Sequence, residues 1–222
     1  MKYCIKFLLI SLFITSCAGV DSGKIAPNYF TAFSMIKGSI LGFEDYPITR
    51  ELVNSIPYAS IKLKIGKGSA GLLILEDIND KNLVYLSSDD VRIIIRNGKI
   101  IRTTGFDHNL IQKEEPRELM HSFLKSAEDS IEYYTYHSYD DPPLNQLRIK
   151  VQKSKIGFET VNILGIDLLL LRIEEKLYNE YLGWQRTNNY WVDENSFVWK
   201  SDQYISPLLP KISFEITKKP TL

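Results

Sequence analysis

The sequence predicts a mainly β fold: an antiparallel, many-stranded sandwich or barrel with a few short helices. Three observations predict it. Apolar and polar side chains alternate over several short segments, and this period of two is typical of half-buried strands. The segments are separated by short turns, and one of these turns, Asn97-Gly98, is a strong hairpin signal. Few stretches show the 3.6-residue period of a helix, so we expect closely spaced strands that pair with their neighbours.

The first predicted elements are a short helix and three strands. Thr49 is a plausible N-cap for a helix over residues 50–56, because its hydroxyl can accept a backbone hydrogen bond in the first turn. Pro57 ends this helix. Isoleucine and leucine then alternate with lysine over residues 61–65. The predicted strands in this part of the chain cover residues 61–65, 70–76 and 83–87.

A tight hairpin is predicted next. The β-branched runs 91–96 and 99–103 flank the dipeptide Asn97-Gly98. A two-residue type I′ turn needs positive φ at both central residues, which Asn and Gly tolerate. Arg96 and Lys99 should therefore lie directly opposite each other.

The rest of the chain continues the strand pattern after a second short helix. Residues 116–127 predict this helix, with Pro116 in its first turn. The apolar run 166–174 fits a buried helix or a buried strand, and its neighbours favour a strand. The remaining predicted strands cover residues 130–137, 146–152, 158–164, 190–192, 197–200 and 212–217.

The N-terminus is typical of an exported protein. Two lysines precede an apolar run, residues 7–14, that is too short to span a bilayer. Residues 14–17 (Ile-Thr-Ser-Cys) resemble the lipobox of bacterial lipoproteins, although an ordinary signal peptide with a chance Cys is an alternative. The predicted organisation is a signal peptide at residues 1–16, a lipidated Cys17 and tether at residues 17–28, and a single β-rich periplasmic domain at residues 29–222.

Composition limits the partners and the chemistry. Of the two cysteines, Cys4 leaves with the signal peptide and Cys17 is consumed by lipid, so we expect a mature domain without disulfides. Without Lys2 and Lys6, 25 basic and 27 acidic side chains remain. This balance argues against nucleic acid, which usually demands a basic surface.

Three segments together carry a family resemblance. They are residues 56–68 (IPYASIKLKIGKG), the hairpin 97–106 (NGKIIRTTGF), and residues 189–210, which contain Asn-Tyr-Trp-Val-Asp and two spaced prolines. Their order and spacing resemble the GfcB/YjbF family of lipoproteins, which is encoded with group 4 capsule and exopolysaccharide genes. Lys99 stands where that family usually has Arg, and Asn195-Ser196 stands where a Thr-Gly turn is common.

The resemblance implies a non-enzymatic, membrane-anchored accessory factor in capsule or exopolysaccharide assembly or export. Its expected partners are the membrane, through lipid on Cys17, periplasmic and outer-membrane proteins of the export system, and polysaccharide. Ala18, where Asp would favour the inner membrane, indicates the periplasmic face of the outer membrane. Two alternatives stay open: an enzyme acting on polysaccharide or peptidoglycan, and a carrier for lipids or outer-membrane assembly.

Four cations of the predicted hairpin form a candidate contact for an anion or a glycan: Arg92, Arg96, Lys99 and Arg102. Like charges directly opposite each other repel, as Arg96 and Lys99 would. An acidic neighbour in the fold, an anionic sugar, a lipid phosphate or an acidic partner would relieve this repulsion. Charged strand edges that prevent aggregation are the alternative explanation.

Aromatic side chains suggest a second candidate contact. Tyr134, Tyr136 and Trp184 form a possible platform on which sugar rings could stack. Successive residues of a strand point to opposite faces, so only some aromatic residues of each cluster can be exposed.

We expect no catalytic residues, metal site or cofactor. His108, His121 and His137 lack the spacing of metal ligands, and we expect structural or solvated roles for them. Asp140 and Asp141 precede two prolines and indicate a loop more than a pair of catalytic carboxylates.

Replacing Cys17 by Ser should abolish lipidation. The thiol is the atom that takes the diacylglyceryl group, and stable anchoring needs two or more acyl chains. Metabolic labelling with palmitate should mark the unsubstituted protein and leave C17S unlabelled and released from the membrane fraction. An unlabelled parent protein, or a C17S variant that still sediments with envelopes, would contradict this prediction.

Overall fold

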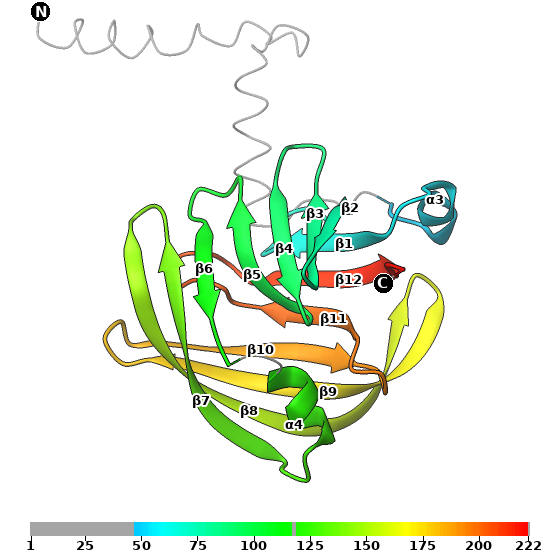
Figure 1. The fold of residues 1–222 in the computed structure, drawn as a ribbon. Coiled ribbons are helices and arrows are strands. Elements are labelled where there is room, and N and C mark those ends of the chain that lie inside the picture. The colour runs from blue at the N-terminus through cyan, green and yellow to red at the C-terminus, as the bar shows by residue number, and fades with distance from the viewer. Residues whose placement is uncertain (1–46, 117–118, 222) are drawn as a thin grey trace, which may run out of the picture. The chain divides into compact units, whose positions relative to one another are not determined.

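Twelve antiparallel strands form one sheet that curls into a nearly closed barrel (Figure 1). The computed structural model describes residues 47–116 and 119–221. The strand order is β5-β4-β3-β2-β1-β12-β11-β10-β9-β8-β7-β6. Each strand therefore pairs with its neighbours in the chain, β1 pairs with β12, and only a ladder between β5 and β6 is missing from a closed barrel. We call this unpaired boundary between β5 and β6 the seam.

The elements have the following bounds: α3 Arg50–Ser55, β1 Ser60–Ile65, β2 Gly71–Asn79, β3 Asn82–Leu86, β4 Arg92–Arg96, β5 Lys99–Thr104, β6 Leu110–Glu114, α4 Leu119–Lys125, β7 Ser130–Tyr139, β8 Leu144–Ile163, β9 Ile166–Asn179, β10 Trp184–Val192, β11 Val198–Gln203 and β12 Ile212–Lys218. The predicted signal peptide, Cys17, the tether and residues 29–46 lie outside the described residues. No helix in the described part of the chain is long and apolar enough to cross a membrane.

The predicted fold class is confirmed, and the structure settles it as a barrel-like sheet. The ambiguous run 166–174 is strand, as favoured, and belongs to β9. The prediction of two strands at residues 146–152 and 158–164 is wrong, because both belong to the 20-residue β8. A β-bulge between Lys155 and Gly157 interrupts its pairing, and this irregularity imitates a turn in the sequence. Strand β6 was not predicted, because only Leu110 of its residues is buried and no alternation results.

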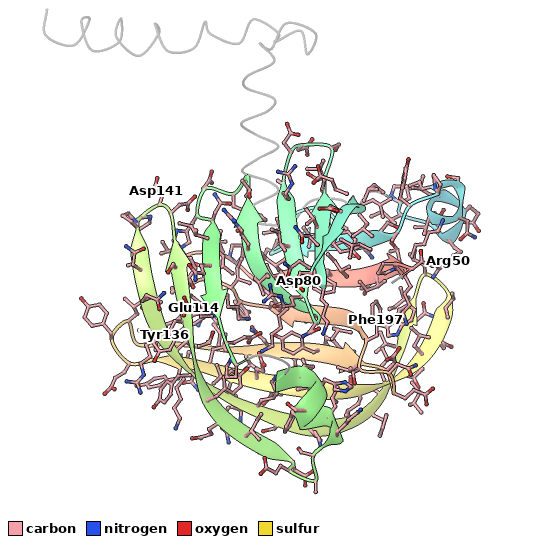
Figure 2. All side chains as sticks on the ribbon, in the orientation of Figure 1. Arg50, Asp80, Glu114, Tyr136, Asp141 and Phe197 are labelled. Atoms are coloured by element: carbon pink, nitrogen blue, oxygen red, sulfur yellow. The ribbon has the colours of Figure 1, made fainter. Side chains whose placement is uncertain are left out.

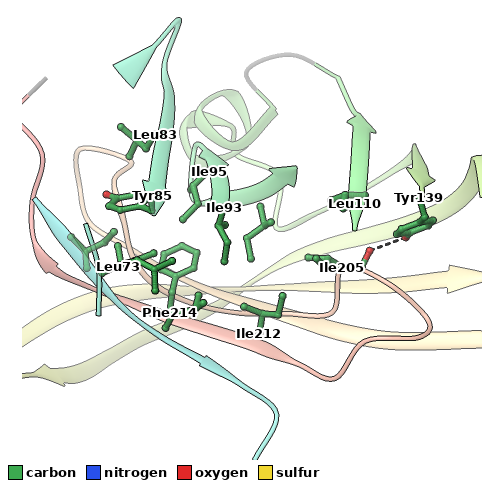
Figure 3. Close-up of a cluster of buried hydrophobic side chains, with 14 residues drawn as sticks. Leu73, Leu83, Tyr85, Ile93, Ile95, Leu110, Tyr139, Ile205, Ile212 and Phe214 are labelled. Atoms are coloured by element: carbon green, nitrogen blue, oxygen red, sulfur yellow. Dashed lines mark hydrogen bonds between the residues drawn. The ribbon is translucent and has the colours of Figure 1, made fainter. Parts of the chain in front are cut away.

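Apolar side chains on the inner faces of β1–β5 and β12 form the largest core cluster (Figure 3). Tyr139, near the end of β7, completes this cluster, and its hydroxyl donates a 2.7 Å hydrogen bond to the carbonyl of Ile205. A second cluster lies under α4, where Met120 and Phe123 pack against Ile173 and Tyr190. Side chains of the two clusters and α4 thus occupy part of the barrel interior.

Hydrogen bonds at its N-terminal end fix α3 in place. Thr49 caps the helix as predicted, because its hydroxyl accepts a 3.2 Å hydrogen bond from the amide of Leu52. The Arg50 guanidinium donates to the carbonyls of Ile163 and Thr217, at 2.7 and 2.8 Å. These bonds hold α3 against the ends of β8 and β12.

The Asn97-Gly98 hairpin forms as predicted, with positive φ at both residues (49° and 76°) and with Arg96 opposite Lys99. Its turn packs directly onto β11. The Gln203 amide donates to the carbonyl of Gly98 at 2.9 Å, and a Cβ on Gly98 would lie 2.2 Å from Val198. Gly98 therefore meets two demands, a left-handed backbone and a close approach between strands.

The substitution Gly98→Ala should destabilise the protein by about 2–4 kcal/mol, because it adds backbone strain to overpacking. Equilibrium urea unfolding of both proteins measures this difference. Gly71→Ala is the matched control, because nothing lies within 4 Å of a Cβ there and its effect should stay within about 0.5 kcal/mol. Equal stabilities for the two variants would contradict the prediction.

Candidate functional site

The four hairpin cations have different environments in the structure. Arg92 donates two hydrogen bonds to the carboxylate of Glu76, at 2.8 and 3.0 Å. Arg96 donates to Asn82 at 2.7 Å. Lys99 is only 2% exposed and is therefore not part of the outer surface, as the hairpin pattern suggested it would be.

Lys99 is part of a buried charge cluster, which we define as Lys99, Glu115, Lys153 and Glu175. The Lys99 ammonium lies 2.6 Å from Glu115 and 2.7 Å from Glu175. Lys153 is directly opposite Glu175 in the β8–β9 ladder, 3.0 Å from the same carboxylate oxygen, although its angles are not those of a hydrogen bond. These acidic neighbours relieve the repulsion between Lys99 and Arg96, which was one of the expected explanations.

Two tyrosines complete the shell of the Glu175 carboxylate. Tyr133 donates to one oxygen at 2.8 Å, and Tyr190 donates to the other at 3.0 Å. Tyr133 also accepts a 2.9 Å hydrogen bond from Lys99. A buried carboxylate costs little only when its lone pairs are engaged in this way.

The cluster shifts the ionisation of its members in opposite directions. Burial alone would raise the pKa of Glu175, but Lys153 and Lys99 outweigh burial and hold that pKa well below its usual range. Burial lowers the pKa of Lys153 to about 8, and the attraction of Glu175 offsets only part of the desolvation. Burial would also lower the pKa of Lys99, but Glu115 and Glu175 raise it well above the ordinary value.

A cavity of about 1390 Å³ lies beside the cluster at the seam. Strands β5 and β6 splay apart below the loop that joins them, as Figure 1 shows. The lining comes from the turns after β2 and β4, from β5 and β6, from the start of α4 and from residues 195–198. It includes Lys99 and Glu115 of the cluster, as well as Arg102 and Lys113.

Lys113 and Arg102 also line the cavity and form no hydrogen bond or close ion pair within the described residues, although Glu115 and Glu175 attract Lys113. Lys113 is half-buried, and burial lowers its pKa. Arg102, one of the predicted contact residues, is exposed. Together with Lys99 they give the seam side of the cavity more positive than negative charge.

A row of exposed side chains crosses the outer face of β7, β8 and β9, and we call it the tyrosine row. The strand register places Tyr134 opposite Lys150 and Lys150 opposite Tyr178. Tyr134 and Tyr178 are 44% and 45% exposed, and neighbouring strands lie about 4.8 Å apart. The guanidinium of Arg148 lies 3.8 Å from the centroid of the Tyr134 ring and restrains it.

The predicted aromatic platform is only partly assembled. Tyr136 is 37% exposed on the same strand and face as Tyr134, and its ladder partner in β6 is Glu114 (Figure 2). Trp184 is wrong as a platform residue, because it is 5% exposed and packs inside the barrel with Leu177. The exposed aromatic residue that accompanies Tyr134 on the outer face is Tyr178, not Trp184.

Two of the three histidines contact the same tyrosine, and all three contact structural groups. His137 is buried and bonds Tyr139 through Nδ1 at 3.1 Å, while His108 stacks on the Tyr139 ring with centroids 4.7 Å apart. His121 lies 3.1 Å from the Ser196 hydroxyl. Within residues 47–116 and 119–221, no three His, Cys, Asp or Glu side chains are arranged to hold a metal ion.

Comparison with known proteins places the chain in a family. The family described as group 4 capsule polysaccharide lipoprotein GfcB, YjbF matches residues 33–217. The chain belongs to the YjbF family. It is 19% identical to the uncharacterized lipoprotein GfcB of Escherichia coli K12, over 83% of each chain. It is 22% identical to the uncharacterized lipoprotein YjbF of that strain, over 75% of this chain and 78% of the other.

The crystal structure of the hypothetical lipoprotein YmcC from Escherichia coli K12 has the same fold. Its TM-score is 0.71 at 18% sequence identity, and the match covers 90% of this chain and 99% of that chain. The expected resemblance to the GfcB/YjbF family is therefore confirmed. Three features in the described part of this YjbF family member are candidates for a functional role: the buried charge cluster, the seam cavity and the tyrosine row.

Sequence reasoning missed Lys153, Glu175 and Tyr178. A signal for the first two was present, because each interrupts an apolar series with period two: Lys153 follows Ile149 and Val151, and Glu175 stands between Ile173 and Leu177. A charge on the inner face of one strand requires a counter-charge on the inner face of another. Which residue that is depends on register, which the sequence alone did not supply.

The substitution Lys153→Met should raise stability near pH 7 by about 2–3 kcal/mol, because a pKa lowered from 10.5 to about 8 means that the folded state disfavours the charged lysine. Between about pH 8 and 10 the unfolded chain binds more protons at Lys153, so the parent protein gains stability with rising pH. The advantage of K153M should therefore shrink by about pH 9.5, before the tyrosines of the unfolded chain ionise.

Urea unfolding at several pH values measures this difference. Lys150→Met on the outer face of the same strand is the control, and its effect should be below about 1 kcal/mol at every pH. A K153M protein less stable than its parent at pH 7 would show that the attraction of Glu175 exceeds the cost of burial.

Proposed function

We propose that this lipoprotein is a non-enzymatic accessory factor in the assembly or export of capsule polysaccharide or exopolysaccharide. The family match over residues 33–217 is the observation that carries this proposal, because the family is named for a group 4 capsule polysaccharide lipoprotein. In this proposal lipid on Cys17 holds the domain at the periplasmic face of the outer membrane. Its partners are the periplasmic and outer-membrane proteins of the same export system.

The charge cluster supports the non-enzymatic part of the proposal. A glycoside hydrolase needs two carboxyl groups that flank the scissile bond. Glu175 is 1% exposed and is contacted by two ammonium groups and two tyrosine hydroxyls. Glu115 is held by Lys99 at 2.6 Å. These contacts suit a structural role, since both carboxylates are already committed inside the fold.

The tyrosine row supplies the contact for polysaccharide in this proposal. Tyr134 and Tyr178 stand two strands apart, roughly 10 Å, with Lys150 between them. One strand spacing is close to the length of one hexose ring, so an extended glycan lying across the strands can place every second sugar on a tyrosine. Aromatic faces stack on the C–H groups of sugars, and Lys150 can bind a hydroxyl or an acidic group.

Deletion of the gene tests the function as a whole. Cells without the protein should lose most of their surface polysaccharide, and the unsubstituted gene should restore it. The amount of polysaccharide extracted from washed cells is the measurement. Unchanged polysaccharide on deletion would sink the proposed function.

The double substitution Tyr134→Ala/Tyr178→Ala tests the contact. Both side chains are exposed, so stability should change by less than about 1 kcal/mol while retention of polysaccharide falls. The measurement is co-precipitation of the full-length protein with polysaccharide extracted from producing cells. Tyr58→Ala, at a 61% exposed tyrosine outside the row, is the matched control and should bind like the parent. Equal retention by the double variant would eliminate the row as the contact.

A further inference from the structure

The seam cavity has aliphatic walls that remain partly open to water. They include Ile78 of β2, Ile94 of β4, Ile101 of β5 and Ile111 of β6. Ile78 and Ile111 are each 41% exposed, which is high for isoleucines that face a shared hollow. Covering such side chains with another apolar surface is favourable. The walls therefore fit an aliphatic chain.

The cations of the cavity differ in how many hydrogen bonds and ion pairs they form. All three donor directions of Lys99 are engaged by Glu115, Glu175 and Tyr133. Lys113 and Arg102, on opposite sides of the seam, have no hydrogen bond or ion pair within the described chain. Glu115 and Glu175 attract Lys113, but they also attract Lys99, and burial still lowers the pKa of Lys113. A bound anion would offset the remaining cost of this half-buried ammonium group.

The carboxylates of the lining neutralise the cations only in part, because Glu115 is shared between Lys99 and Lys113. Glu115 is held by Lys99, and Glu114 accepts hydrogen bonds from Gln112 and Gln146 at 2.6 and 3.2 Å. Asp80 lies in the β2–β3 turn beside Lys81. The charge left available at the seam is therefore positive.

We propose that the seam cavity binds an amphiphile with one aliphatic chain and one anionic head group, a carboxylate or a phosphate. The head group lies between Lys113 and Arg102, and the chain lies along the isoleucines. The volume, about 1390 Å³, exceeds that of ordinary small-molecule sites and leaves room for a long chain. The described lining contains no Tyr or Trp, so stacking on sugars does not explain it. This site is separate from the tyrosine row and does not require the proposed role in polysaccharide export.

Photolabelling of the full-length protein in phosphatidylcholine nanodiscs tests the site. Three probes of equal chain length are compared: a diazirine-tagged fatty acid, the corresponding alkyl phosphate and the corresponding alcohol. At least one of the acids should label peptides of β4–β6, and the uncharged alcohol should label them about tenfold less, because each charge-assisted bond contributes strongly to binding. The better acid identifies the head group.

The double variant Lys113→Gln/Arg102→Gln should lose labelling of these peptides by about tenfold or more. It breaks no hydrogen bond or close ion pair of the described residues, so its circular dichroism should match that of the parent. Loss of the attraction between Lys113 and Glu115 should lower the melting temperature by no more than a few degrees. Lys150→Gln/Lys176→Gln removes two cations from the outer face and should label like the parent. Equal labelling by acids and alcohol, unchanged labelling of the double variant, or no labelling of β4–β6 would each overturn the proposal.

Discussion

The barrel depends on Glu175, because the sheet has two ends and no backbone ladder joins them. Strand β5 supplies Lys99, the residue after β6 supplies Glu115, and both are connected through Lys99 to Glu175 on the inner face of β9. One backbone amide adds to this closure, since Leu110 donates to the hydroxyl of Thr103 at 2.9 Å. Side-chain contacts thus join β5 to β6, whereas in a closed barrel backbone hydrogen bonds join the first and last strands.

Closure by buried ions has a cost that closure by a ladder does not have. The desolvation cost of each buried charge is offset only where hydrogen bonds and ion pairs engage its lone pairs or protons. On Glu175 the hydroxyls of Tyr133 and Tyr190 do this. For Lys153 the attraction of Glu175 does not fully offset the desolvation cost, since the pKa of this lysine falls to about 8. Replacing Glu175 by an apolar residue should therefore destabilise the protein more than the same replacement at Lys153.

The seam also explains where the cavity lies. Hydrogen-bonded strands stay about 4.8 Å apart, and β5 and β6 are free of that restraint below their connecting loop. They splay apart, and Ile101 of β5 and Ile111 of β6 come to line the hollow between them. The same missing ladder that calls for the charge cluster thus creates the cavity beside it.

Local signals in the sequence were sufficient for most of the fold. The Asn97-Gly98 turn with its flanking β-branched runs, the Thr49 cap and the alternation in β1 depend on neighbours in the chain, and all were predicted correctly. The site depends on register between distant strands. The hairpin pattern suggested that Lys99 is exposed, but the curl of the sheet brings Lys99 of β5 to Glu175 of β9, and pairing of β8 with β9 adds Lys153 to the same carboxylate.

Trp184 also shows that exposure could not be predicted without the arrangement of the strands. Its aromatic ring suited a surface platform, but the strand β10 begins at this residue and turns it into the barrel. Tyr178 appears on the outer face for the equivalent reason, because it is opposite Lys150 in the β8–β9 register. Composition and motifs identified the kinds of side chain at the site, and the register of the sheet decided which of them reach a ligand.

The two proposed contact regions meet at one pair of strands. Glu114, on the cavity lining, is the ladder partner of Tyr136, which shares a face with Tyr134 (Figure 2). Strands β5 and β6 are the two edges of the described sheet, and β6 has a ladder to β7 alone. Strand β7 carries Tyr134, whereas Tyr178 lies two strands away on β9. Only the Tyr134 end of the tyrosine row therefore adjoins a strand that lines the cavity.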